Sequence, residues 1–94
     1  MTIRVGYSRR AAAEAEEITA YLAEYSEPAA TRFREGLRRA ERQLADFPNS
    51  GAPGLRPGTR RLIVGDYILS YRRRGGGDVE VFAVRHARRR DARF

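Results

Sequence analysis

The sequence predicts an α+β fold in which an N-terminal strand and an αα-hairpin precede a three-stranded antiparallel meander, in the order β-α-α-β-β-β. Three observations predict it. Apolar residues recur at helical spacing in two consecutive segments, a loop rich in proline and glycine follows, and apolar runs separated by glycine turns complete the chain. Helices that precede the meander should gather on one face of a mostly antiparallel sheet. The length of 94 residues suits a single domain over 1–94.

The first strand is predicted within "TIRVGYS", where Ile3, Val5 and Tyr7 alternate with smaller or charged residues. Ser8 suits a helix N-cap, because its hydroxyl can accept a hydrogen bond from a free amide of the first turn. The first helix is predicted over residues 9–25. Its apolar stripe consists of Ala11, Ala15, Ile18, Leu22 and Tyr25, and the side expected in solvent carries Glu14, Glu16, Glu17 and Glu24.

The second helix is predicted to start directly after the first, at "SEP". Ser26 can cap it, Glu27 suits the positive end of the helix dipole, and Pro28 is tolerated in a first turn. This helix should run to about Asp46. Its stripe consists of Ala30, Phe33, Leu37, Ala40, Leu44 and Phe47. Two stripes joined by a short link predict an αα-hairpin whose apolar residues pack mainly in the core.

The remaining elements follow from turn residues. "PNSGAPGLRPG", residues 48–58, is predicted to be a loop, because three prolines and three glycines prevent a long element. "TRRLIVGDYILSYRR", residues 59–73, indicates two strands joined at Gly65-Asp66. "GGGD" forms the next turn, and "VEVFAVR", residues 79–85, supplies the last strand.

The net charge of +7 is unevenly distributed. Residues 1–47 hold eight arginines and eight acidic residues, whereas residues 48–94 hold eleven arginines and four acidic residues. The whole excess therefore lies in the second half, which favours an acidic protein or a nucleic acid as partner. All nineteen basic residues are arginine, which fits a GC-rich genome as well as phosphate or carboxylate recognition.

Composition excludes several kinds of site. The chain has no cysteine and a single histidine, so a disulfide, a thiolate metal site or a multi-histidine zinc centre cannot form, and we expect no metal or cofactor. No phosphate-binding P-loop or nucleophile elbow is present. "MTIRVGYSRR" lacks the apolar run of a signal peptide, and no stretch is long and apolar enough to span a membrane, so a cytoplasmic location is expected.

The arginines of the second half are the strongest candidate site. Arg60 and Arg61 begin one strand, Arg72, Arg73 and Arg74 end the next, and the last strand leads into Arg85, His86, Arg88, Arg89 and Arg90. We expect Arg60 or Arg61 to approach His86 and Arg89. Neighbouring arginines would keep that histidine neutral and able to act as a base, and they could stabilise a developing phosphorane. The simpler alternative is that these arginines are solvated turns and chain ends.

The whole chain resembles the RelE/ParE superfamily of bacterial toxin–antitoxin modules. The resemblance rests on "VGYSRRAAAEAEEITAYL", "FPNSGAPGLRPGTRRLIVGDYILSYR" and "VFAVRHARRRD", in this order and spacing. It implies a helical hairpin packed on a small antiparallel sheet, which agrees with the fold predicted above. RelE-like members cut mRNA on the ribosome, whereas ParE-like members poison DNA gyrase and are not thought to be nucleases.

The resemblance is closer to the ParE branch. Arg61 and Arg89 match basic positions of RelE-like enzymes, but Thr59 and Ile68 stand where other basic residues would be, and no tyrosine follows His86. The resemblance thus implies a toxin that inhibits gyrase without catalysis. The alternatives are a ribosome-dependent mRNA endoribonuclease using Arg61, His86 and Arg89, and a non-toxic module that only binds an antitoxin.

The resemblance also implies two surfaces. The target, gyrase or else ribosome and mRNA, would be bound by Arg60, Arg61, Arg85, His86, Arg88, Arg89 and Arg90. A small acidic ParD-like antitoxin, disordered until bound, would form a hetero-oligomer with the toxin and pair with an exposed strand edge. Its predicted contacts are Ile18, Leu22, Phe33, Leu37, Arg72 and Arg73.

Overall fold

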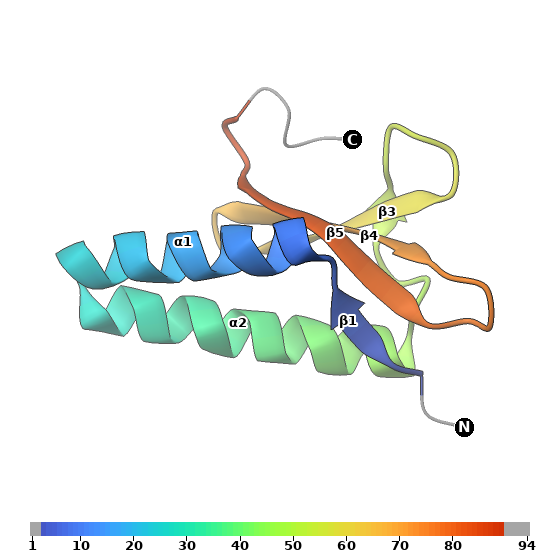
Figure 1. Ribbon diagram of the computed structural model, residues 1–94, viewed down its shortest axis with the longest axis horizontal. Helices are drawn as coiled ribbons and strands as arrows, with labels where there is room; N and C mark the ends of the chain where they lie inside the picture. The colour runs from blue at the N-terminus through green and yellow to red at the C-terminus, as the bar shows by residue number, and fades with distance from the viewer. Residues whose placement is uncertain (1–2, 90–94) are drawn as a thin grey trace.

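The computed structural model describes residues 3–89 and has the predicted layers, a sheet and a helical hairpin against one of its faces (Figure 1). The helices α1 and α2 span Arg9–Tyr25 and Glu27–Asp46. The strands are β1 (Val5–Tyr7), β2 (Ala52–Pro53), β3 (Thr59–Val64), β4 (Tyr67–Arg73) and β5 (Val79–His86). The predicted α+β class and the predicted order of its main elements are confirmed.

The sheet has the strand order β1-β5-β4-β3-β2. β3, β4 and β5 form the predicted antiparallel meander, with the pairs Val64↔Tyr67 and Tyr67↔His86 at one end. β1 joins in parallel beside the first residues of β5. The predicted loop 48–58 contains the two-residue strand β2, which pairs with Arg60 and Arg61. Proline and glycine excluded a long element there but not this short edge strand.

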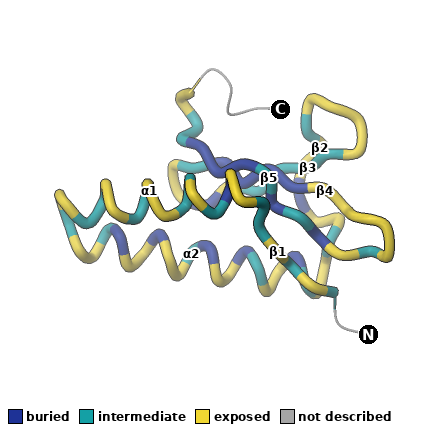
Figure 2. The backbone as a smooth tube through the Cα atoms, in the orientation of Figure 1, coloured by how far each residue is buried: buried dark blue, intermediate teal, exposed yellow. Residues whose placement is uncertain are grey.

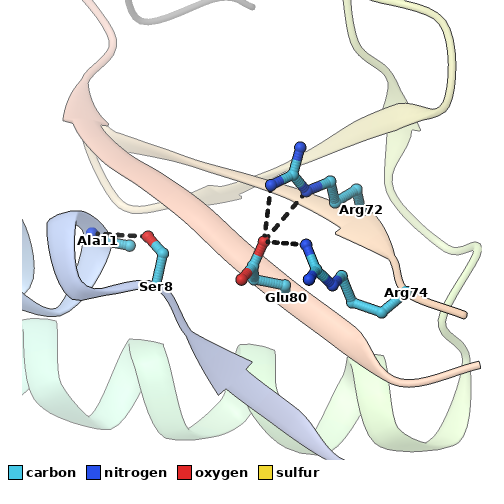
Figure 3. A network of polar contacts seen from close by, with 5 residues as sticks. All are labelled: Ser8, Ala11, Arg72, Arg74 and Glu80. Atoms are coloured by element: carbon cyan, nitrogen blue, oxygen red, sulfur yellow. Dashed lines mark hydrogen bonds and ion pairs between the residues drawn. The ribbon is translucent and has the colours of Figure 1, made fainter.

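Both helices begin at the predicted serines. The Ser8 hydroxyl accepts from the Ala11 amide at 3.1 Å, and the Ser26 hydroxyl accepts from the Ala29 amide at 3.2 Å (the first of these is drawn in Figure 3). Each bond satisfies an amide that has no partner within its helix. Because Ser26 both ends α1 and caps α2, the chain reverses within one residue and the helices lie side by side (Figure 1).

The core lies between α2 and the sheet (Figure 2). The buried residues of α2 are Ala30, Phe33, Leu37, Ala40 and Leu44, and they pack with Leu69, Tyr71, Val79, Val81 and Val84. Only Ala11 is fully buried on α1. The last members of the two predicted stripes, Tyr25 and Phe47, are 74% and 66% exposed, because the helix ends extend past the residues that cover the rest of each stripe.

Glu14 differs from its prediction as a solvated residue. Its carboxylate accepts from the Val84 amide at 3.0 Å and from Arg85 Nε at 3.1 Å, and its side chain is only 16% exposed. β1 accompanies β5 only as far as Val81, so the next part of that strand edge lies beside α1. A carboxylate there supplies the acceptor that a longer β1 would otherwise offer. The other predicted solvated acids, Glu16, Glu17 and Glu24, are exposed.

Candidate functional site: two ends of the sheet and a groove

The predicted meeting of Arg60 or Arg61 with His86 is wrong. The first and third strands of an antiparallel meander run parallel to each other, so the start of β3 and the end of β5 lie at opposite ends of the sheet. His86 pairs with Tyr67, whereas Arg61 pairs with Ser70, about 10 Å further along β4. Side chains three residues apart on a strand also point to opposite faces. Arg61 is therefore separated from His86 both along the sheet and by the face to which its side chain points, whereas Arg89 lies beside His86.

Four arginines gather where β3 begins and β4 ends; we call this region the arginine end. Arg72 donates from Nε and Nη2 to Glu80 Oε1 at 3.1 and 2.9 Å, and Arg74 reaches the same oxygen at 3.3 Å (Figure 3). Arg73 donates to the Gly77 carbonyl at 2.7 Å. Arg60 donates to the Gly51 carbonyl at 2.8 Å. Each of the four thus has a partner within the chain.

Arg85 is a second correction to the predicted target-binding set. Its side chain is 1% exposed and forms an ion pair with Glu14, so it joins α1 to β5 instead of facing a partner. In the sequence, Arg85 looks like the first member of the arginine-rich tail. Its burial follows from its place inside β5, opposite the buried Ile68. Arg88 and Arg89 are exposed beyond the strand, and Arg90 lies outside the described residues.

His86 lies at the other end of the sheet, among aromatic rings. Its ring meets the ring of Tyr67 edge-on at 5.3 Å, and Tyr67 in turn packs against Phe33 of α2 at 5.0 Å. The His86 Nδ1 accepts from the Arg88 amide at 3.1 Å, which fixes the turn after β5. Tyr21 and Tyr25 of α1 form a further pair at 5.0 Å. We call the set Tyr21, Tyr25, Tyr67 and His86 the tyrosine end.

Tyr67 is electrostatically coupled to its neighbours. Burial raises the pKa of its hydroxyl, and the nearby Tyr21 and Asp66 raise it further through their negative charges. A tyrosine hydroxyl is already neutral at physiological pH, and the raised pKa extends this neutrality to more alkaline conditions. Tyr67 can therefore donate a hydrogen bond to a partner while its ring contributes apolar area.

A groove of about 430 Å³ separates α2 from β3 and the β3–β4 turn. Its floor is apolar, with Phe33, Ala40 and Leu62, and Ile63 stands on its rim with 65% of its surface exposed. Gly36 permits the close approach of α2 to β3, because a Cβ there would lie 2.8 Å from Val64 Cγ1. Its lining consists of Leu22, Ala29, Arg32, Phe33, Gly36, Arg39, Ala40, Gln43, Leu62, Ile63, Val64, Gly65, Asp66 and Tyr67.

The groove follows a strand edge that β2 leaves open. β2 pairs with β3 only at Arg60 and Arg61, and no other described strand pairs with β3 on that side. From Leu62 onward the backbone of β3 can therefore accept an added strand. The exposed side chains of Arg32 and Arg39 border the groove on α2 and give it a positive rim.

The predicted antitoxin contacts lie in three different regions of the structure: the groove, the core and the arginine end. Leu22 and Phe33 line the groove, and Ile18 packs against the core beside them. Leu37 is only 9% exposed and belongs to the core. Arg72 and Arg73 lie at the arginine end, away from the groove lining.

Sequence reasoning missed Arg32, Arg39, Ile63 and Tyr67 as members of the groove. A signal for the two arginines is present, because they stand seven residues apart and flank the α2 stripe on one helix face. Ile63 and Tyr67 looked like ordinary strand residues. Only the short reach of β2 exposes that part of β3, and two strand residues in a loop gave no sequence signal.

Residues 3–89 contain no group of three histidine, aspartate or glutamate side chains placed to hold a metal ion. Within the same range, no helix is long and apolar enough to cross a membrane. The same residues form three features suited to binding: an apolar groove with a basic rim, an open strand edge and a cluster of aromatic rings.

Comparison with known proteins gives one consistent result. Residues 5–91 match the family described as the ParE toxin of type II toxin-antitoxin systems, parDE. The protein "Putative toxin Y4kP" of Sinorhizobium fredii is 37% identical over 86 residues, which cover 89% of this chain and 88% of that protein. A solved structure of the chromosomal ParDE TA system from P. aeruginosa has the same fold, with a TM-score of 0.75, 20% identity and coverage of 89% of this chain and 95% of that chain. The chain belongs to the ParE toxin family of type II toxin–antitoxin systems.

Proposed function

We propose that this ParE-family toxin acts in the cytoplasm by inhibiting DNA gyrase, without catalysis, and that an acidic ParD-like antitoxin neutralises it by filling the groove between α2 and β3. Membership of the ParE toxin family supports the toxin–antitoxin part of this proposal. The separation of Arg61 from His86 is the observation that favours a non-catalytic toxin over an mRNA endoribonuclease.

The predicted ribonuclease set would need His86 as base and both Arg61 and Arg89 at the same scissile phosphate. Arg89 lies beside His86, with its amide donating to the His86 carbonyl at 3.0 Å, but Arg61 does not. A general base must reach its proton within a hydrogen bond or through one water molecule. His86 and Arg61 are about 10 Å apart along the sheet and point to opposite faces. An inhibitor that acts by binding needs no such convergence, so the same geometry does not count against gyrase inhibition.

The groove fits the chemistry of an antitoxin tail. A disordered acidic segment that folds on binding would place apolar side chains against Phe33 and Leu62 and carboxylates near Arg32 and Arg39. Its backbone could pair with β3 beyond Arg61. Apolar contact and strand addition would supply affinity, and charge complementarity would speed association.

Gyrase inhibition is tested first by following thymidine and methionine incorporation side by side after induced expression in a sensitive bacterium. Early loss of thymidine incorporation, together with inhibition of supercoiling by purified gyrase, supports the proposal. Early loss of methionine incorporation instead indicates mRNA cleavage. Loss of neither indicates a module that only binds its antitoxin.

The variant His86→Ala separates the same alternatives within the chain. A gyrase inhibitor should keep its activity within about threefold, because one partly buried ring at an interface rim contributes little. A ribonuclease should lose at least about a hundredfold with its general base. A hundredfold loss in growth inhibition with no effect on gyrase would contradict the proposal.

The groove is tested with Ile63→Asp, which places a negative charge on its rim where an acidic tail would lie. We expect the affinity for the ParD-like antitoxin to fall at least about tenfold, because the substitution removes an apolar contact and adds a charge that repels the carboxylates of an acidic tail. Leu55→Asp is the matched control, because Leu55 is similarly exposed at 72% and is absent from the groove lining. Equal affinities for the two variants would exclude the groove as the antitoxin site.

A further inference from the structure

Two neighbouring tyrosines stand exposed on α1. Tyr21 and Tyr25 are one helical turn apart, 56% and 74% exposed, and their rings pack against each other at 5.0 Å with a tilt of 59°. Contiguous exposed apolar surface often marks an interaction site, and these two rings adjoin each other. The pairing also holds the rings in place, so they would lose little conformational freedom on binding.

These rings continue toward the sheet. Leu22, the residue that follows Tyr21 on α1, lines the same groove as Tyr67. Tyr67 contacts the ring of His86 at 5.3 Å. β5 runs toward the side of the molecule on which α1 has its C-terminal end (Figure 1). The tyrosine end therefore combines the exposed ring pair of α1 with the Tyr67–His86 ring pair of the sheet.

We propose that the tyrosine end is the surface through which the toxin binds a protein target. This inference rests on the proposed function. It adds that the main contact with the target is made by tyrosines and not by the arginines. Tyrosine is enriched among the residues that dominate binding energy, because it combines a large apolar ring with a hydroxyl that can still form hydrogen bonds. A partner with an apolar pocket for Tyr21 and Tyr25 fits this surface.

The surrounding charges favour a protein over a nucleic acid. Glu17 and Glu24 are exposed one turn on either side of Tyr21, and Asp66 is exposed beside Tyr67. These carboxylates would repel the phosphates of a strand that stacked its bases on the rings. The exposed Arg88 lies beyond His86. The partner should therefore carry basic side chains facing α1 and acidic side chains facing the end of β5.

Tyr67 also connects this surface with the groove. It lines the groove and contacts His86, so a ligand that fills the groove ends against the tyrosine end. An antitoxin that covers Tyr67 would thus remove part of the target-binding surface directly. Neutralisation would follow from this overlap, with no conformational change required of the toxin.

The experiment compares growth inhibition by the wild type and by the double variant Tyr21→Ser/Tyr25→Ser at matched expression levels. We expect at least a tenfold loss of potency for the double variant. Tyr21→Phe/Tyr25→Phe, which keeps the rings, should recover most of it. Leu55→Ser is the control for loss of exposed apolar surface elsewhere and should stay within about twofold of the wild type. Circular dichroism and thermal unfolding establish that all variants fold.

Other outcomes overturn the inference. The double variant could remain as potent as the wild type, or the wild type could fail to inhibit growth. A labelled single-stranded DNA or RNA oligonucleotide could bind the wild type and lose its binding in the double variant, which would make the rings a nucleic-acid platform. The growth assay reports loss of target binding whichever protein is the target. The supercoiling assay on the wild type therefore tests gyrase separately, and either idea can fail while the other holds.

Discussion

The arginine end and the tyrosine end differ in how many of their side chains already have partners within the chain. At the arginine end, Arg72 and Arg74 share one oxygen of Glu80, and Arg60 and Arg73 donate to backbone carbonyls. At the tyrosine end, Tyr21 and Tyr25 contact each other and otherwise face solvent. A residue type that looks suited to binding is therefore a weak guide to a binding surface until its partners within the chain are known.

The difference has a simple cause. An arginine at a turn finds carbonyls and carboxylates within reach of its long side chain, and each such bond lowers the advantage of binding an outside partner. Tyrosine side chains on the outer side of a helix have few such acceptors within reach. Figure 2 shows α1 alternating between exposed and intermediate residues, and Tyr21 and Tyr25 are 56% and 74% exposed.

The largest expected effect comes from breaking the ion pair that joins α1 to the strand leading into the tyrosine end. Glu14→Ala should lower the free energy of unfolding by about 3–5 kcal/mol, because it leaves the buried Arg85 without its carboxylate partner and the Val84 amide without an acceptor. Urea unfolding measures this. Glu17→Ala on the exposed side of the same helix should change it by less than about 0.5 kcal/mol. A similar result for both variants would contradict the role assigned to Glu14.

A smaller effect is expected at the arginine end. Gly51→Ala places a Cβ 2.7 Å from both the Arg61 carbonyl and the Tyr71 hydroxyl, so the loop carrying the Arg60 acceptor must shift. We expect a loss of about 1–3 kcal/mol in thermal or urea unfolding. Gly75→Ala is the matched control, because a Cβ there meets no atom within 4 Å. A fully stable Gly51→Ala protein would show that this end is not held by close packing.

Alkaline pH should weaken the contact that ties β1 to α2. The Tyr7 hydroxyl donates to Glu41 at 2.7 Å, and burial, followed by that hydrogen bond and the charge of Glu41, raises the pKa of Tyr7 above its ordinary value. A raised pKa favours the neutral phenol in the folded state. Its contribution is complete below the unfolded pKa of about 10 and is lost as pH rises above it. The melting temperature should therefore fall less steeply for Tyr7→Phe than for the wild type between about pH 9 and pH 11.

The smallest effect is expected for the exposed ion pair of the arginine end. Arg74→Ala should cost less than about 1 kcal/mol, because the side chain is 55% exposed and Arg72 still binds the same Glu80 oxygen. The difference from the wild type should shrink further in high salt. Growth inhibition should not change. A tenfold loss of potency in this folded variant would restore the arginine end as a target surface.

Most of the fold could be predicted from local patterns. Ser8 and Ser26 begin the helices where expected, and Gly65-Asp66 joins two strands where expected. These features depend on residues that are neighbours in the chain, so their signals are local. The strand β2 could not be predicted in this way, because two residues pair only when a partner strand is already beside them.

The candidate site was predicted less well. Leu22 and Phe33 were predicted as antitoxin contacts, and both line the groove in which we propose that the antitoxin binds. Glu14 was assigned to solvent and Arg85 to the target-binding surface, because nothing in the sequence indicates that residues 71 positions apart form a buried pair. The expected meeting of Arg61 with His86 was wrong although the meander itself was predicted, because the first and third strands of a meander run parallel and place the start of β3 and the end of β5 at opposite ends of the sheet.

The sequence by itself determined the helices, their caps, the main strands and the excess of arginine in the second half, because these follow from residue type and short-range spacing. Only the tertiary structure decided which charged groups are already paired and which rings stay exposed. Pairing and burial are properties of residues brought together from distant parts of the chain, as for Glu14 with Arg85 and for Tyr67 with His86. The groove likewise exists because β2 covers only two residues of the β3 edge.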